Sequence, residues 1–158
     1  MEKRAKRLHR WYTITQVLFI LSPLICYAYL SIKLSEVQYS LQELLQLDPT
    51  IAITFLIAMI NPFIAYQIRL IKKRLENGDT SYVYINMMLL VLSQILLSNY
   101  FYLALLIVVF YKTMKVYDIS LRDGFISSKR LSNIKHVVGS VSIILLSSLC
   151  FYASMQVM

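Results

Sequence analysis

Neutral amide side chains lie inside apolar stretches of this sequence, where a polar group is costly unless it bonds to another. Those that could line a cavity are Gln16, Asn61, Asn86 and Gln94. Asn61 directly precedes Pro62, and a second proline, Pro23, follows Ser22. A proline inside a helix removes one backbone donor and kinks the helix. Two broken helices with these amides could line a polar cavity of the kind found in transporters. The alternative is that the amides bridge neighbouring helices by hydrogen bonds.

Residue patterns that support catalysis or cofactor binding are missing from the sequence. The two histidines, His9 and His136, stand beside basic residues and belong to no metal-binding spacing such as H-E-x-x-H. No G-x-S-x-G motif occurs, and three glycines are too few for a phosphate-binding loop. All 16 Lys and Arg and all 8 Asp and Glu fall outside the apolar stretches or at their ends. We therefore expect a non-enzymatic protein with no metal or other cofactor, in which Cys26 and Cys150 serve packing.

The elements that position these side chains are predicted to be membrane-spanning helices. Of the 158 residues, 58% are hydrophobic and 15% charged, and the mean hydropathy is +0.62. So many apolar residues, in stretches near membrane-span length, cannot all be buried in one small soluble core. We predict an all-α integral membrane protein that forms a single polytopic domain over 1–158. Its five transmembrane helices are expected at about 11–32, 51–68, 82–97, 100–116 and 137–158.

The number of spans depends on residues 82–111, thirty residues without a formal charge. One helix of that length would rise about 45 Å, against a hydrocarbon core of about 30 Å. It would also place the six following Lys and Arg outside the cell. Two short helices separated at Ser98-Asn99 return these cations to the cytoplasmic side. We therefore predict a helical hairpin and five spans, with four spans as the alternative.

The positive charges set the predicted orientation. The net charge of +8 would suit nucleic-acid binding only if the basic residues shared one face, but they form three blocks separated by apolar runs. The blocks are a basic arm at 1–10 and two loops at 69–81 and 112–136. By the positive-inside rule the N-terminus is cytoplasmic and the C-terminus outside, with 15 of the 16 Lys and Arg inside. We expect a bacterial-type cytoplasmic membrane, contact with membrane lipid and no nucleic-acid partner.

Local patterns predict where individual helices begin and end. Residues 33–50 carry three acidic residues and leucines at helical spacing, which predicts a short amphipathic helix on the outer membrane surface. Ser35, followed by Gln three residues later, fits a capping box at its start. Asp48-Pro49 predicts the start of the second span, and Asn77-Gly78 predicts the end of that helix.

The predicted cytoplasmic loop at 112–136 mixes cations with apolar side chains. Attraction to anionic lipid is one explanation, but the apolar content exceeds what adhesion by charge alone requires. A docking site for a cytoplasmic protein is therefore the sharper hypothesis. Its candidate residues are Lys115, Arg122, Phe125, Lys129, Arg130 and Lys135.

Small residues recur at seven-residue steps in the last span, at Ser140, Ser147 and Ser154. A seam of small residues lets two helices approach closely, and a 3.5-residue period suits left-handed packing. The seam could pack within the chain, against a partner helix or in a homo-oligomer. Asn61 is a further candidate for helix packing.

The expected function is binding to another protein. A small multi-pass protein with a basic cytoplasmic face and no catalytic group suits a membrane-bound regulator or antagonist, an immunity protein, or an accessory subunit. The alternative is a transporter or pore component whose path uses the two kinked spans.

Overall fold

The computed structural model describes residues 2–37, 43, 46, 48–117 and 137–157. Within these ranges the chain forms five helices and no strand: α1 (Glu2–Val37), α3 (Pro49–Glu76), α4 (Thr80–Leu96), α5 (Tyr100–Tyr117) and α7 (Val138–Val157). Four of them contain a stretch long and apolar enough to cross a membrane, and α4 is the shorter exception. The all-helical fold is confirmed, and these four helices are consistent with a multi-pass membrane protein.

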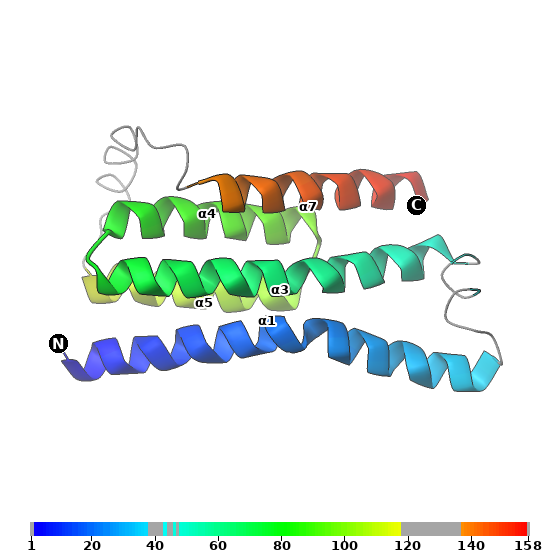
Figure 1. Ribbon diagram of the computed structural model, residues 1–158, viewed down its shortest axis with the longest axis horizontal. Helices are drawn as coiled ribbons and strands as arrows, with labels where there is room; N and C mark the ends of the chain where they lie inside the picture. Colours follow the sequence, from blue (N-terminus) through cyan, green and yellow to red (C-terminus); the bar gives the residue numbers. More distant parts are fainter. Residues whose placement is uncertain (1, 38–42, 44–45, 47, 118–136, 158) are drawn as a thin grey trace.

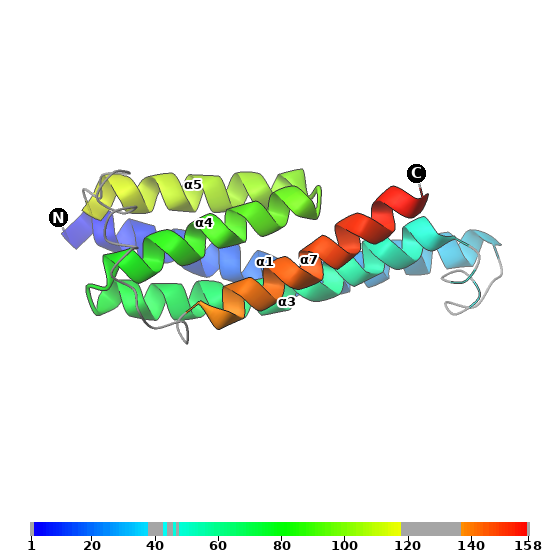
Figure 2. The same cartoon turned by 90° about the horizontal axis from the view of Figure 1, so that it is seen from above.

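The helices lie roughly side by side in one elongated bundle (Figure 1). Contacts run from α1 to α3, α3 to α7, α7 to α4, α4 to α5 and α5 back to α1, with α3 and α4 also touching. Figure 2 shows the same bundle from above, with α7 lying across α3 and α4. The N-terminus, the α3–α4 turn and the end of α5 therefore gather at one end of the bundle.

Polar side chains are buried in this bundle while large apolar side chains cover its outside. In the part of the chain whose burial is described, the buried polar residues are all uncharged: Thr15, Ser22, Asn61, Gln67, Asn86, Ser93, Gln94, Thr113, Ser140 and Ser147. Leu24, Phe63 and Leu149 are examples from three helices of apolar residues that are more than 60% exposed. A soluble surface rarely carries apolar side chains in such number, whereas lipid solvates them well.

The predicted starts and ends of α3 are confirmed. The carboxylate of Asp48 accepts a hydrogen bond from the Thr50 amide at 2.9 Å, and Pro49 is the first helical residue. Gly78, with φ of +79°, ends the helix, because the Gly78 amide bonds to Leu75 O and the Asp79 amide to Arg74 O. Most of the basic stretch expected as a loop at 69–81 is thus the last two turns of α3.

The charge-free run at 82–111 forms two helices, as predicted, with a turn at residues 97–99. The Ser98 amide bonds to Ile95 O and the Asn99 amide to Gln94 O, the same terminating pattern that follows α3. At the position that glycine favours stands Ser98, with φ of +52°. A side chain in this left-handed region costs about 1 kcal/mol or more, so the backbone here is strained.

The basic arm expected at 1–10 is helical over its described residues, because α1 begins at Glu2 and continues without a break through the basic residues. One local prediction about this helix is wrong: no helix starts at Ser35, since α1 continues to Val37. The capping-box pattern fails because no glycine or proline interrupts the helix between 24 and 37. Of the expected amphipathic helix, 38–42, 44–45 and 47 lie outside the described residues, while Glu43 and Gln46 are helical.

The α4–α5 hairpin is shorter than its neighbours. Its turn lies beside the middle of α1 and α3, both of which extend well beyond it toward their outer ends (Figures 1 and 2). Helix α7 also extends past the turn. The hairpin turn therefore stands at the middle of the bundle and not at its end.

Candidate functional site

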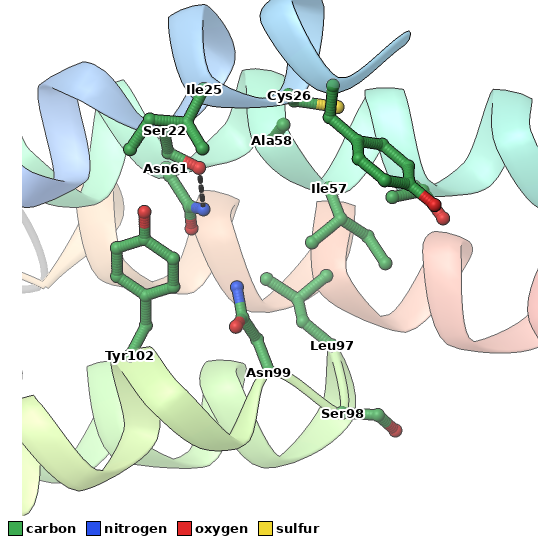
Figure 3. Close-up of a pocket in the computed structure, with 12 residues that line it drawn as sticks. Ser22, Ile25, Cys26, Ile57, Ala58, Asn61, Leu97, Ser98, Asn99 and Tyr102 are labelled. Carbon is green, nitrogen blue, oxygen red and sulfur yellow. Dashed lines mark hydrogen bonds between the residues drawn. The ribbon is translucent and has the colours of Figure 1, made fainter. Parts of the chain in front are cut away.

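A pocket of about 490 Å³ lies where the α4–α5 turn meets the middle of α1 and α3. We call it the mid-bundle pocket. Figure 3 shows its walls, which come from α1, α3, the turn and α5. The lining residues are Ser22, Ile25, Cys26, Tyr29, Thr54, Ile57, Ala58, Asn61, Leu97, Ser98, Asn99 and Tyr102. None of these is Lys, Arg, Asp, Glu or His, so the pocket is polar at a few points and uncharged.

The Asn61 amide is the most deeply buried polar group of the pocket. Its exposure is 0%, and its Nδ2 donates a hydrogen bond to Ser22 Oγ at 2.7 Å. Its Oδ1 has no hydrogen-bond partner. An unpaired buried acceptor costs about 1–3 kcal/mol, which a donor from outside the protein would recover.

Proline places further polar atoms at this level of the bundle. Pro62 has no N–H to donate to the carbonyl of Ala58, a lining residue, and Pro23 likewise leaves the Phe19 carbonyl without its usual helical donor. Pro23 directly follows Ser22, and Pro62 directly follows Asn61, and the side chains of Ser22 and Asn61 are hydrogen-bonded to each other. The Ser22-Pro23 and Asn61-Pro62 pairs, which are far apart in the sequence, therefore lie side by side in the structure.

The turn and α5 complete the pocket from the opposite side. In Figure 3 the side chains of Asn99 and Tyr102 point toward α1 and α3, whereas Ser98 points away. The Tyr102 ring packs against Phe19 at 4.6 Å between centroids, and its hydroxyl donates to the Leu18 carbonyl at 3.3 Å. These contacts fix the position of the hairpin tip against α1.

The other three amides do not line the mid-bundle pocket. Asn86 bridges helices, which is the alternative that the sequence analysis left open: its Oδ1 accepts from Ser140 Oγ at 2.7 Å, and its Nδ2 donates to Tyr82 O. Gln94 is 0% exposed, and neither atom of its amide has a partner. Gln16 is half-buried on α1. Asn61 therefore lines this pocket, and Asn86 joins two helices.

The serine seam of α7 lies partly in the interface with α3 and α4. Ser140 and Ser147 are 0% exposed, and Ser154 is half-buried. Ser147 Oγ donates within its own helix, to Ile143 O at 2.8 Å. Beside Ser140, a Cβ added at Gly139 would overlap the end of the Gln67 side chain of α3, so Gln67 would have to move aside.

Cations from three helices gather at the end of the bundle that holds the N-terminus (Figure 1). We call this the basic end. Its described side chains are Lys6, Arg7, Arg10, Arg69, Lys72, Lys73, Arg74, Lys112 and Lys115. Of the predicted docking residues, Lys115 is an exposed member. Arg122, Phe125, Lys129, Arg130 and Lys135 lie outside the described residues.

A groove of about 300 Å³ opens at the basic end between α1 and α5. Arg7 and Lys115 line it, and Lys112 Nζ lies 3.7 Å from the centroid of the Trp11 ring, a cation–π contact. Leu8 and Val116 supply apolar lining. This pairing could not be predicted from the sequence, because residues 7–11 and 112–116 are separated by about a hundred residues.

The remaining interactions of the basic end tie its helices together. Glu76 Oε1 of α3 lies 3.4 Å from His9 Nδ1 of α1, and Lys72 Nζ donates to Thr13 Oγ1 at 3.3 Å. Arg74 lies 5.5 Å over the Tyr82 ring of α4. His9 therefore contacts Glu76 across the interface between α1 and α3. Among the described residues, no group of three or more His, Cys, Asp or Glu could hold a metal ion, and both cysteines are free thiols.

Comparison with known proteins adds no relative to this picture. No protein-family model, curated protein or solved structure matches the chain.

Proposed function

We propose that the protein is a non-enzymatic membrane protein that binds another protein through its basic end, as a regulator or antagonist, an immunity protein or an accessory subunit. We place the N-terminus in the cytoplasm and the C-terminus outside, in a bacterial-type cytoplasmic membrane. The positive-inside rule supports this orientation. The orientation holds whether or not the α4–α5 hairpin crosses the membrane, because a hairpin returns the chain to the side it left.

The observation that carries this proposal is the convergence of cations from α1, α3 and α5 on one end of the bundle. Among the side chains that the structure describes, nine Lys and Arg belong to this end, against the two carboxylates of Glu76 and Asp79. Such a surface attracts an acidic protein and steers its approach. The groove beside Trp11 adds apolar and aromatic area next to the charge, and aromatic residues and Arg are enriched in protein interfaces.

Co-purification of charge variants tests the proposal. The neutral variant carries Arg10→Gln, Lys73→Gln and Lys115→Gln, all at exposed positions. The matched control keeps the charge with Arg10→Lys, Lys73→Arg and Lys115→Arg. We expect a stoichiometric protein partner with the wild type and the control, and at least about tenfold less with the neutral variant. Equal recovery with both variants would contradict binding through the basic end.

Transport or pore formation is a second candidate function, and the mid-bundle pocket is the observation that favours it. Transporters place substrate sites near the membrane midplane at broken helices. Flux across proteoliposomes that is lost in Asn61→Leu would support this function. If a panel of uncharged solutes shows no flux and a protein partner is recovered, transport is refuted and protein binding remains as the function.

A further inference from the structure

The height of the α4–α5 turn can be measured against α1, because two contacts fix the register of α5. Lys112 stacks on Trp11, and Tyr12 Oη lies 3.0 Å from Thr113 Oγ1. Asn99 lies thirteen residues before Lys112, so the turn stands about 20 Å from the level of Trp11 along the helix axis. Helix α1 rises about 33 Å from Trp11 to Lys33, close to the full hydrocarbon thickness of about 30 Å. The turn therefore ends roughly 10 Å short of the outer boundary.

The contacts of the turn agree with this height. Leu97, Ser98 and Asn99 share a pocket with Ser22 and Cys26 of α1, which lie near the middle of the stretch from Trp11 to Lys33. Irregular backbone at membrane depth is tolerated only where protein buries it or where it lines a cavity. The turn meets this condition, since its amides bond within the hairpin and it lines the mid-bundle pocket.

The pocket also indicates the chemistry of a ligand. It offers an unpaired acceptor, Asn61 Oδ1, at a residue with 0% exposure. Among the described lining residues there is no Lys, Arg, Asp, Glu or His to neutralise a charged ligand, and burying an uncompensated charge is prohibitive. The walls beside Asn61 are apolar or aromatic, including Ile25, Ile57 and Tyr102. A suitable ligand is uncharged, donates one hydrogen bond and has an apolar body.

We propose that the α4–α5 hairpin enters the membrane from the cytoplasmic side without crossing it, and that its tip closes a binding site for a lipid-like alcohol. The hydroxyl of the alcohol donates to Asn61 Oδ1, and its chain lies against the apolar walls. The site does not depend on protein binding at the basic end. If the protein is a transporter, the second candidate function, then lipid-like alcohols are the class of substrate that this site predicts.

Photolabelling of the purified protein in lipid nanodiscs tests the ligand, with an octanol that carries a diazirine as the probe. We expect adducts on residues lining the pocket, such as Tyr29 and Tyr102. Excess octanol should compete, whereas octane, which has the same chain without the donor, should compete at least about fivefold less, the worth of one hydrogen bond. Equal competition by octane would overturn the proposed recognition, and this readout needs no variant to fold.

A pair of asparagine variants tests the acceptor itself. Asn61→Leu should lower the labelling about fivefold. Asn86→Leu, an equal loss of a buried amide outside the pocket, should label like the wild type. Wild-type labelling of a folded Asn61→Leu protein would refute the role of Asn61.

Thiol labelling tests the depth of the turn independently of any ligand. In a background with Cys26 and Cys150 replaced by Ala, Ser98→Cys should resist a membrane-impermeant maleimide added from outside. Met155→Cys, which is 64% exposed near the outer end of α7, should react. Equal reaction at both positions would show that the hairpin crosses the membrane and would overturn this part of the proposal.

Discussion

The hydrogen bond between Ser140 and Asn86 joins α7 to α4, and its removal should be measurable. The bond is 2.7 Å long, and the two residues are 0% and 1% exposed. Ser140→Ala removes the hydroxyl that donates to Asn86 Oδ1, which leaves this oxygen without its donor. The Asn86 side chain is held in place by the bond from its Nδ2 to Tyr82 O, so it does not turn to another partner. Interhelical hydrogen bonds in membrane proteins contribute about 0.6–1.7 kcal/mol. We therefore expect Ser140→Ala to lower the free energy of unfolding by about 1 kcal/mol.

Ser147→Ala is the matched control, because it makes the same substitution at 0% exposure in the same helix. The Ser147 hydroxyl bonds to a carbonyl of its own helix, so its loss leaves no unpaired group in the interface. We expect a cost of only a few tenths of a kcal/mol. The assay is unfolding in mixed micelles titrated with a denaturing detergent, followed by circular dichroism. Equal destabilisation by both variants would refute the bridging role of Ser140.

Three further substitutions test separate parts of the fold by thermal unfolding in detergent. Gly139→Ala should destabilise by less than about 1 kcal/mol, because the added Cβ displaces only the flexible end of Gln67 and alanine favours the helix by about 1 kcal/mol; a loss of about 3 kcal/mol would show that Gln67 cannot move aside. Ser98→Gly should stabilise by about 1 kcal/mol through relief of the positive φ, and a lower midpoint would contradict strain at this turn. Tyr12→Phe should lower the stability by about 1 kcal/mol. The Thr113 hydroxyl already donates to Val109 O, so in this variant the Thr113 oxygen loses the hydrogen bond that it accepts from Tyr12. A neutral effect would mean that the contact between α1 and α5 depends on packing alone.

Patterns that act within a few residues were predicted well from the sequence. The Asp48 cap, the glycine end at Gly78 and the split of the charge-free run at Ser98-Asn99 all depend on local backbone chemistry. The failed capping box at Ser35 marks the limit of such patterns. A serine with a glutamine three residues later also fits inside a helix, and nothing nearby stops α1.

Features that depend on relative helix height could not be predicted. The sequence indicates how long α4 and α5 are, but their depth against α1 follows from contacts such as Lys112 on Trp11. The same holds for the pocket. Asn61 and Ser22 each stand out beside a proline, yet their pairing across 39 residues needs the packing of α1 on α3. Gln16, Asn86 and Gln94 have equally polar side chains, but they do not line the pocket, because lining it depends on the height and the face of each residue in the packed bundle.

The central claim is that the basic end binds a protein, and site-specific photocrosslinking in cells tests it most directly. A benzophenone amino acid replaces Lys115 at the basic end or, as a control, Lys33 at the opposite end. The account predicts a discrete protein adduct at position 115 that is absent at position 33 and disappears when Arg10 and Lys73 are changed to Gln. No adduct at position 115, or one that survives this loss of charge, would contradict it.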